Sequence, residues 1–207
     1  AEGPVAGGVG WAPIEQEGLD EFLQKLGTHP KLKGIRRLIQ SEADPQFCAR
    51  PEFVAGVRKL APLGLSFDLC IYHPQLAAAI QLVRQVPEVN FVLDHIGKPA
   101  IKDKVQEPWK TQLRELAALP NVWCKVSGMV TEADWTSWQA KDLRPYLDQV
   151  IDCFGFGRLM FGSDWPVSTL AASYQRWLEV VQEAVKGASA AEQGQLFWGT
   201  AAAFYRL

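Results

Sequence analysis

The sequence predicts an α/β fold of the (β/α)-barrel type, in which parallel strands alternate with helices. Three observations support this prediction. Short apolar runs alternate with longer amphipathic segments along all 207 residues, and this alternation requires a parallel sheet with crossover helices. No glycine-rich nucleotide-binding fingerprint of an open doubly wound sheet follows any run. Several apolar runs end in polar residues, as barrel strands do at their catalytic ends.

The six predicted strands are short runs rich in Val, Ile, Leu and Phe. They contain few polar residues, which is typical of strands covered on both faces. The runs are Pro4–Ala12, Lys33–Gln40, Leu65–His73, Asn90–Gly97, Asn121–Gly128 and Arg158–Asp164.

The predicted helices are longer segments in which apolar residues recur at helical spacing. Within 143–154, for example, Leu143, Tyr146, Leu147 and Val150 lie on one helix face. The predicted helices are Leu19–Leu26, Glu52–Leu63, Leu76–Val86, Trp109–Leu119, Leu143–Phe154, Leu170–Val185 and Ala190–Tyr205. Gly64, Pro87 and Pro120 mark the ends of three of them.

The number of strands is two short of a complete barrel, which has eight. We therefore expect a (β/α)8 barrel of which the first two β/α units are absent, so that the chain begins inside the fold. No linker or low-complexity tract divides the sequence. We expect a single domain over residues 1–207.

Composition limits the classes of function. The net charge is −2, and 21% of the residues are charged, without a block of like charges. These values favour neither a nucleic-acid nor a membrane-surface role, and no apolar stretch is long enough to span a membrane. Four separated cysteines, without a CxxC pair, predict reduced and mostly buried thiols in a cytoplasmic protein; they are Cys48, Cys70, Cys124 and Cys153.

The strongest candidate for catalysis is Asp164, in the segment Phe-Gly-Ser-Asp-Trp-Pro at 161–166. Gly162 permits close packing as the chain leaves the last strand, and Pro166 fixes the exit. A carboxylate held at this strand end can ligate a metal or take a proton from water. The alternative is an N-cap for the following helix.

A second candidate is His95, in Asp-His-Ile-Gly-Lys-Pro at 94–99. Imidazole can bind zinc, polarise a carbonyl or transfer a proton near neutral pH. Because Asp94 and His95 are adjacent, a continuing strand would point their side chains to opposite faces. We expect His95 to face the barrel interior.

Other candidates follow the same strand ends. Arg36 and Gln40 share one face of their strand and could orient a substrate, whereas Arg37 points the other way. A buried arginine is costly unless it is paired with an anion, so Arg36 is a candidate for a substrate carboxylate or hydroxyl group. His73 is a candidate ligand or substrate contact. His29 precedes a strand and is excluded, because this end of a barrel serves stability.

Two further segments supply candidates for substrate binding. Lys125 and Ser127 share one face of their strand with Trp123, and both side chains are expected to reach the pocket. Trp11 and Trp165 stand near strand ends, where they could wall a sugar-like ligand.

Several segments closely resemble the amidohydrolase-related TIM-barrel family, in the group of L-fuconolactonases, L-rhamnonolactonases and 2-pyrone-4,6-dicarboxylate hydrolases. The resemblance runs along the whole chain, and Asp-His-Ile-Gly-Lys-Pro followed by Phe-Gly-Ser-Asp-Trp-Pro at this spacing is specific to it. The resembling segments are GIRRLIQ (34–40), FVLDHIGKP (91–99), NVWCKVSGMVTEADW (121–135), LRPYLDQVIDCFG (143–155), RLMFGSDWPV (158–167) and FWGTAAAFYRL (197–207).

The resemblance implies roles for three residues. Asp164 matches the last-strand aspartate that serves as metal ligand and general base, and His95 matches the histidine that contacts the metal or the substrate carbonyl. Arg36 matches an arginine of the substrate-contacting strand. Some members use zinc or another divalent ion. This chain lacks the family's first-strand His-x-His, so we expect little or no metal affinity from Asp164 and His95 alone, since catalytic zinc sites have three protein ligands.

Three functional hypotheses follow. The first is a hydrolase that opens a small-molecule, sugar-type lactone. The second is a metal-dependent decarboxylase of the same superfamily. The third is a non-catalytic fragment, which either packs with a partner chain or is simply a truncated product. A barrel without two strands has two open sheet edges, so a homo-oligomer formed by edge pairing is one such assembly.

Overall fold

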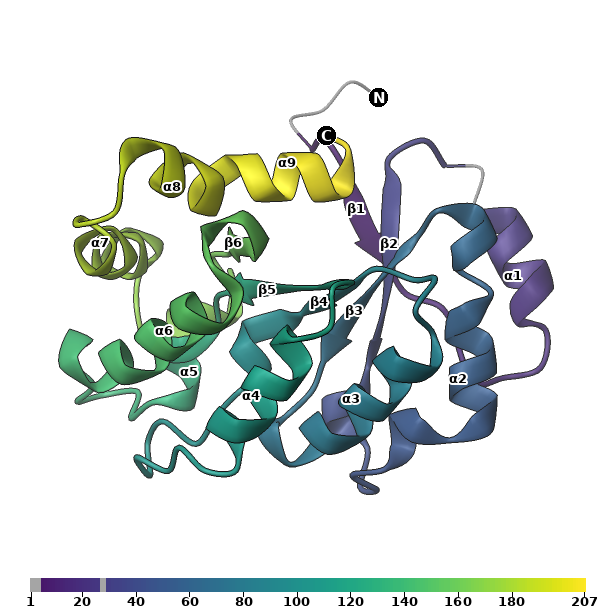
Figure 1. Ribbon diagram of the computed structural model, residues 1–207, viewed down its shortest axis with the longest axis horizontal. Helices are drawn as coiled ribbons and strands as arrows, with labels where there is room; N and C mark the ends of the chain where they lie inside the picture. Colours follow the sequence, from purple (N-terminus) through teal and green to yellow (C-terminus); the bar gives the residue numbers. More distant parts are fainter. Residues whose placement is uncertain (1–4, 27–28) are drawn as a thin grey trace.

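The computed structural model describes residues 5–26 and 29–207. In these ranges six parallel strands form one sheet in sequence order, so each strand is paired with the strands before and after it (Figure 1). The two outer strands are not paired with each other, and the described residues do not form the closed eight-stranded barrel. The strands are β1 (Gly8–Gly10), β2 (Leu32–Leu38), β3 (Ser66–Cys70), β4 (Phe91–Leu93), β5 (Val122–Val126) and β6 (Leu159–Phe161).

The helices follow the predicted order, and each main crossover contains one. They are α1 (Leu19–Leu26), α2 (Pro51–Arg58), α3 (Leu76–Gln85), α4 (Trp109–Ala117), α5 (Met129–Glu132), α6 (Ala140–Phe154), α7 (Tyr174–Ala184), α8 (Ala190–Gly194) and α9 (Thr200–Tyr205). A π-helical turn over Gln195–Gly199 joins α8 to α9, so the predicted helix Ala190–Tyr205 is one helical run.

The observed strands are shorter than the predicted ones at their carboxyl ends. The residues predicted to end the strands form short turns instead, such as His73–Gln75 and Asp94–Gly97. Pro4, the first residue of the first predicted strand, lies outside the described residues. The polar strand-end residues are thus carried by turns, whose side chains do not follow the alternation of a strand.

One face of the curled sheet is covered by the helices. The opposite face lines the inside of the curve and is called the inner face below. The parallel register places Leu69, Leu93 and Cys124 side by side, and all three belong to the large buried cluster beneath the helices. On the inner face Val92 and Met160 form a second, small cluster with Tyr205 of α9. The inner face therefore depends on the end of the chain.

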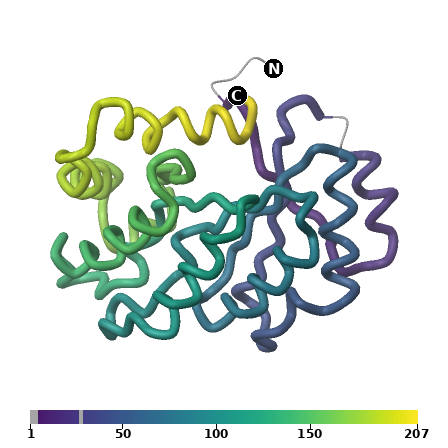
Figure 2. Tube along the Cα trace, viewed as in Figure 1, coloured from purple at the N-terminus to yellow at the C-terminus, as the bar shows by residue number. Residues whose placement is uncertain are grey.

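The last helix lies across the amino ends of the strands (Figure 2). Arg206 donates a hydrogen bond to the carbonyl of Gly64, just before β3, and Lys33 donates one to the carbonyl of Arg206 at 3.1 Å. Leu207 lies against the start of β1, where its Cδ2 atom would be 2.8 Å from a Cβ atom on Gly7. The opposite end of the sheet, where the strands terminate, is left for the candidate site.

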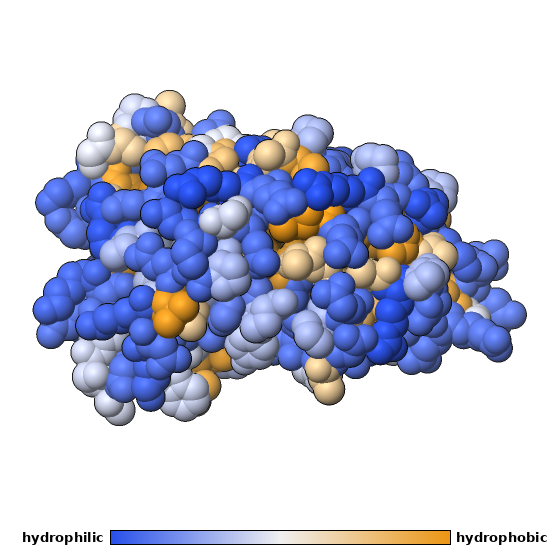
Figure 3. Space-filling view, turned by 60° about the horizontal axis from the view of Figure 1, so that its bottom comes forward, coloured by the Kyte–Doolittle hydropathy of each residue, from blue (hydrophilic) through white to orange (hydrophobic). Residues whose placement is uncertain are grey.

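Two composition-based predictions can be compared with the fold. All four cysteines are free; Cys48, Cys70 and Cys124 are buried and Cys153 is partly buried. No helix in the described ranges is long and apolar enough to cross a membrane. The face shown in Figure 3 is mostly hydrophilic, with apolar residues in separate patches.

Candidate active site

Asp164 is held beyond the end of β6 by backbone and side-chain contacts. The Gly162 amide donates to the carbonyl of Val126, and the Gly162 carbonyl accepts a hydrogen bond from the Trp177 indole at 2.9 Å. A Cβ atom on Gly162 would be 2.9 Å from Cβ of Ser127, so glycine is needed for this close approach. Within the described residues the Asp164 carboxylate contacts His95, and no backbone amide bonds it, which argues against the N-cap alternative.

His95 lies in a single turn of left-handed backbone that follows β4. His95, Ile96, Gly97 and Lys98 all have positive φ, at 54°, 51°, 75° and 46°. Such a conformation costs roughly 1–2 kcal/mol for each residue that has a Cβ atom. Strain of this kind persists only where the surrounding structure determines it, and it concentrates at functional sites.

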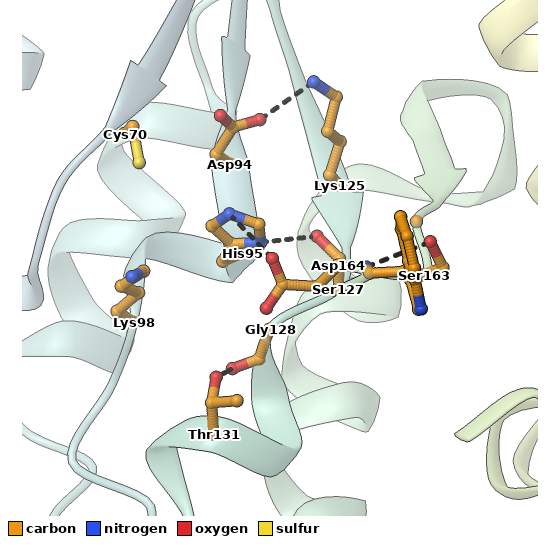
Figure 4. A network of polar contacts seen from close by, with 12 residues as sticks. Cys70, Asp94, His95, Lys98, Lys125, Ser127, Gly128, Thr131, Ser163 and Asp164 are labelled. Carbon is orange, nitrogen blue, oxygen red and sulfur yellow. Dashed lines mark hydrogen bonds and ion pairs between the residues drawn. The ribbon is translucent and has the colours of Figure 1, made fainter. Parts of the chain in front are cut away.

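The turn corrects the expectation that Asp94 and His95 face opposite sides. Because β4 ends at Leu93, the alternation of a strand no longer applies at residues 94 and 95. Both side chains lie at the inner end of the sheet: His95 contacts Ser127 and Asp164, and Asp94 contacts Lys125 (Figure 4). Asp94 also pairs with Arg36. The expectation that His95 faces inward agrees with this placement.

His95 and Asp164 are brought together from two strand ends. His95 Nε2 is 3.6 Å from Asp164 Oδ1, and each side chain is only 12% exposed. His95 Nδ1 is 2.8 Å from Ser127 Oγ, a contact that fixes the ring. Burial lowers the pKa of His95 and raises the pKa of Asp164. The lowered pKa favours the neutral form of the imidazole, and the raised pKa makes the neighbouring carboxylate a stronger base than an exposed aspartate.

A buried charge network lies beneath this pair. Lys125 Nζ is 2.9 Å from Asp94 Oδ1 and 2.5 Å from Asp68 Oδ2, and Arg36 Nη1 is 3.1 Å from Asp94 Oδ2. The Tyr205 hydroxyl donates to Asp68 from α9, at 3.1 Å. Burial raises the pKa of Asp68, to about 6. Burial opposes the charge on Lys125, but Asp94 and Asp68 raise its pKa well above its ordinary value.

The predicted substrate-binding residues lie in different surroundings: two form ion pairs inside the protein, one bonds a thiol, and the side chains of two have no such contact with the described residues. Arg36 and Lys125 are bound to internal carboxylates. Gln40 accepts a hydrogen bond from the Cys70 thiol at 3.3 Å. The partly buried His73 side chain makes no hydrogen bond to another described residue, and Trp165 is 69% exposed beside Asp164. Within the described ranges none of these five residues contacts the His95–Asp164 pair through a hydrogen bond or ion pair.

Sequence reasoning missed four residues near the site. Asp68 is a polar residue inside an apolar strand and was detectable by this signal, whereas nothing in the sequence connects Tyr205 with it. Lys98 and Glu132 form an ion pair with Nζ and Oε1 3.8 Å apart. Lys98 belongs to the segment Asp-His-Ile-Gly-Lys-Pro at 94–99, but its partner Glu132 comes from the short helix α5.

Two sets of donors could hold a metal ion. Ligand atoms of Cys70, Asp94 and His95 lie within 4.8 Å of one another. Asp94, however, already binds Lys125 and Arg36, whose charges would repel a cation. His95 Nε2 and Asp164 Oδ1 fit better, because two ligands about 2.1 Å from a tetrahedral zinc ion are about 3.4 Å apart, close to the observed 3.6 Å.

Parallel strands whose carboxyl ends carry a histidine and an aspartate are typical of enzymes of the barrel type. The chain belongs to the amidohydrolase family, whose model matches residues 1–207, and this confirms the resemblance found in the sequence. A curated L-fucono-1,5-lactonase from Burkholderia multivorans is 42% identical over 100% of this chain and 73% of its own length. A second L-fucono-1,5-lactonase, from Burkholderia ambifaria, is 34% identical over 98% of this chain and 71% of its own length.

Solved structures agree with the family. The crystal structure of an amidohydrolase from Burkholderia multivorans with bound zinc superposes with a TM-score of 0.92 at 40% identity. That comparison covers 98% of this chain and 74% of the crystallised chain. The six-stranded sheet thus corresponds to the larger part of an amidohydrolase barrel.

Proposed function

We propose that this protein is a hydrolase that opens sugar-type lactones of the L-fuconolactone or L-rhamnonolactone kind. The observation that carries the proposal is the His95–Asp164 pair, at 3.6 Å and mostly buried, at the ends of β4 and β6. Two relatives at 34% and 42% identity are named L-fucono-1,5-lactonase. An L-rhamnono-gamma-lactonase from Scheffersomyces stipitis is 26% identical over 82% of this chain and 58% of its own length.

In the proposed reaction Asp164 acts as the general base. Its carboxylate takes a proton from water, and the water oxygen forms a bond to the lactone carbonyl carbon. The ring C–O bond then breaks, and Asp164 returns the proton to the leaving alkoxide, which gives the hydroxy acid. A base with a raised pKa suits this task, because proton transfer is most effective when the pKa lies near the working pH.

The second residue of the proposed centre is His95, whose role depends on which ring nitrogen carries the proton. Ser127 Oγ accepts a hydrogen bond from Nδ1–H in the tautomer that leaves the Nε2 lone pair toward Asp164. The same Nε2 and the Asp164 carboxylate are the atoms that would hold a divalent ion, which we propose to be zinc, as in the 40% identical relative. When bound, such an ion polarises the carbonyl as a Lewis acid.

The test is hydrolysis of a panel of aldonolactones by the purified 207-residue chain, with and without added zinc. Asp164→Asn is expected to lower kcat/KM by roughly a hundredfold or more, the usual contribution of a positioned base. Asp148→Asn is the matched control, because Asp148 forms an exposed ion pair with Arg144 on α6. An absence of lactone hydrolysis, or release of carbon dioxide from aromatic acids instead, contradicts the proposal.

A further inference from the structure

Lys98 and Glu132 are polar residues of the site that the reaction above does not use. The side chains of Lys98 and Glu132 are 12% and 17% exposed, respectively, and Lys98 Nζ lies 3.8 Å from Glu132 Oε1. This separation exceeds that of a charge-assisted hydrogen bond, about 2.7–2.9 Å. Within the described ranges neither head group makes a hydrogen bond; Lys98 otherwise lies 4.9 Å from the centroid of the Tyr72 ring.

The pair is located beside the reacting centre. Lys98 ends the left-handed turn that begins with His95, so one piece of strained backbone places both side chains. In Figure 4 His95 lies between Lys98 and Asp164. The charge of Lys98 lowers the pKa of both His95 and Asp164, although burial is the larger influence on each. Asp164 in turn adds to the effect of burial in raising the pKa of Glu132.

Two mostly buried charged groups without hydrogen bonds have an unused capacity for binding. Neither head group is among the fully buried polar atoms, so a ligand can reach both, and an ion pair at 3.8 Å leaves their hydrogen-bonding capacity largely free. The ammonium can only donate hydrogen bonds, and the ionised carboxylate can only accept them. A hydroxyl group does both, so neighbouring ring hydroxyls can accept from Lys98 and donate to Glu132 at the same time.

We propose that Lys98 and Glu132 form a subsite that binds the ring hydroxyls of the substrate and so distinguishes a polyhydroxylated lactone from a plain one. This inference rests on the proposed function, because it assigns the substrate class of the same site. The partly exposed ring of Tyr72, against Lys98, offers an apolar wall to the C–H face of such a ring. Sites built to hydrogen-bond a hydroxyl discriminate strongly against analogues that lack it.

The experiment measures binding rather than turnover. The probes are a six-membered lactam with three ring hydroxyls, which mimics the sugar lactone but resists hydrolysis, and δ-valerolactam, which has no hydroxyl. Calorimetry on the full chain gives both dissociation constants. The preference is the constant for δ-valerolactam divided by the constant for the hydroxylated lactam, and this is the ratio compared between variants. We expect Lys98→Met and Glu132→Gln each to reduce this ratio by about tenfold or more, the effect of losing a hydrogen bond to a charged group.

The controls separate binding from folding. Lys102→Met removes a lysine of an exposed pair with Asp134, Nζ to Oδ2 3.5 Å, and should leave the ratio unchanged. Lys98→Arg should restore part of the ratio, and urea unfolding shows which variants remain folded. The inference is overturned if the unsubstituted chain does not prefer the hydroxylated lactam, or if the substitutions weaken both lactams equally. If the lactam preference is present but no lactone is hydrolysed, the proposed function fails and the subsite stands.

Discussion

A Cβ atom on Gly128 would lie 2.7 Å from Cγ and 2.8 Å from Nδ1 of the His95 ring. Gly128 also has a φ of 64°, which residues with a Cβ atom rarely adopt. The imidazole therefore occupies the space that any side chain at position 128 would need. This contact locates the ring from the β5 side, while Ser127 bonds it at Nδ1.

Gly128→Ala should therefore displace the His95 ring and destabilise the fold. Strain and steric overlap together predict a loss of about 1–3 kcal/mol in the free energy of unfolding, and a large fall in kcat/KM. Gly187→Ala is the control, because nothing lies within 4 Å of a Cβ atom there. Equal unfolding midpoints for the two variants in urea would show that the overlap relaxes without cost.

Trp109→Phe should destabilise the left-handed turn at residues 95–98, which Trp109 of α4 contacts. The buried Trp109 indole donates to the carbonyl of Ile96 at 2.8 Å, and phenylalanine would leave this carbonyl unsatisfied. The expected loss is about 1–3 kcal/mol, with faster hydrogen exchange of the Lys98 amide, which bonds the carbonyl of His95. The matched control is Trp135→Phe, since the exposed Trp135 makes the same kind of bond to Thr131. A Trp109 variant as stable as this control would argue against the role of the indole.

The sequence predicted the alternation of strands and helices, and it indicated the two candidate residues that the structure brings together, His95 and Asp164, because both inferences depend on local patterns. Apolar runs specify strands, and polar residues that follow them lie at one end of a parallel sheet. The turn at His95 was not predictable in this way. Its conformation depends on contacts with Trp109 and Gly128, and residues that have a Cβ atom carry no local signal for positive φ.

The buried charges show the same limit. Lys125 was predicted to reach the pocket, and its strand face was correct. Its partner Asp68 comes from β3 and its partner Asp94 from the turn after β4, and Tyr205 is 137 residues from Asp68 in the chain. Which opposite charges meet inside a barrel depends on the register between strands, and composition and spacing do not specify this register.

The dependence of activity on pH should reflect the environment of Asp164. Burial raises the pKa of this carboxyl, while His95 and Lys98 oppose the shift. Because the base is active only when ionised, kcat/KM should fall as the pH drops through this pKa, at a higher pH than for an exposed aspartate. Lys98→Met removes an opposing cation and should move the acidic limb to still higher pH. A limb that stays in place in the variant would contradict the electrostatic coupling.

Asp68 should give the protein a stability term that is lost as the pH rises. Burial is the largest cause of its shift, from 3.8 to about 6, and Lys125 opposes it. The folded chain thus holds this proton more tightly than the unfolded chain, so the contribution is complete below 3.8 and is lost as the pH passes about 6. The difference in unfolding free energy between the unsubstituted chain and Asp68→Asn should therefore fall over this range.

Asp44→Asn is the matched comparison, because its effect on the unfolding free energy should depend on pH in the opposite direction. A hydrogen bond from the Gln46 amide, with help from Arg50, lowers the pKa of the exposed Asp44 carboxyl. Its contribution is present above the unfolded pKa and is lost as the pH falls, so the difference for this variant should change in the opposite direction. Parallel pH profiles for the Asp68 and Asp44 variants would refute the assignment of the buried network.

The open sheet edges should make the chain associate with itself. In the described part of the chain β1 pairs with β2 alone and β6 with β5 alone, and Val9 on the β1 edge is 36% exposed. Unpaired edges offer backbone donors and acceptors to another strand, and an edge lysine prevents such pairing. Val9→Lys should lower the association measured by sedimentation velocity, whereas Val105→Lys, in an exposed loop, should not. If the two variants sediment alike, association does not use the β1 edge.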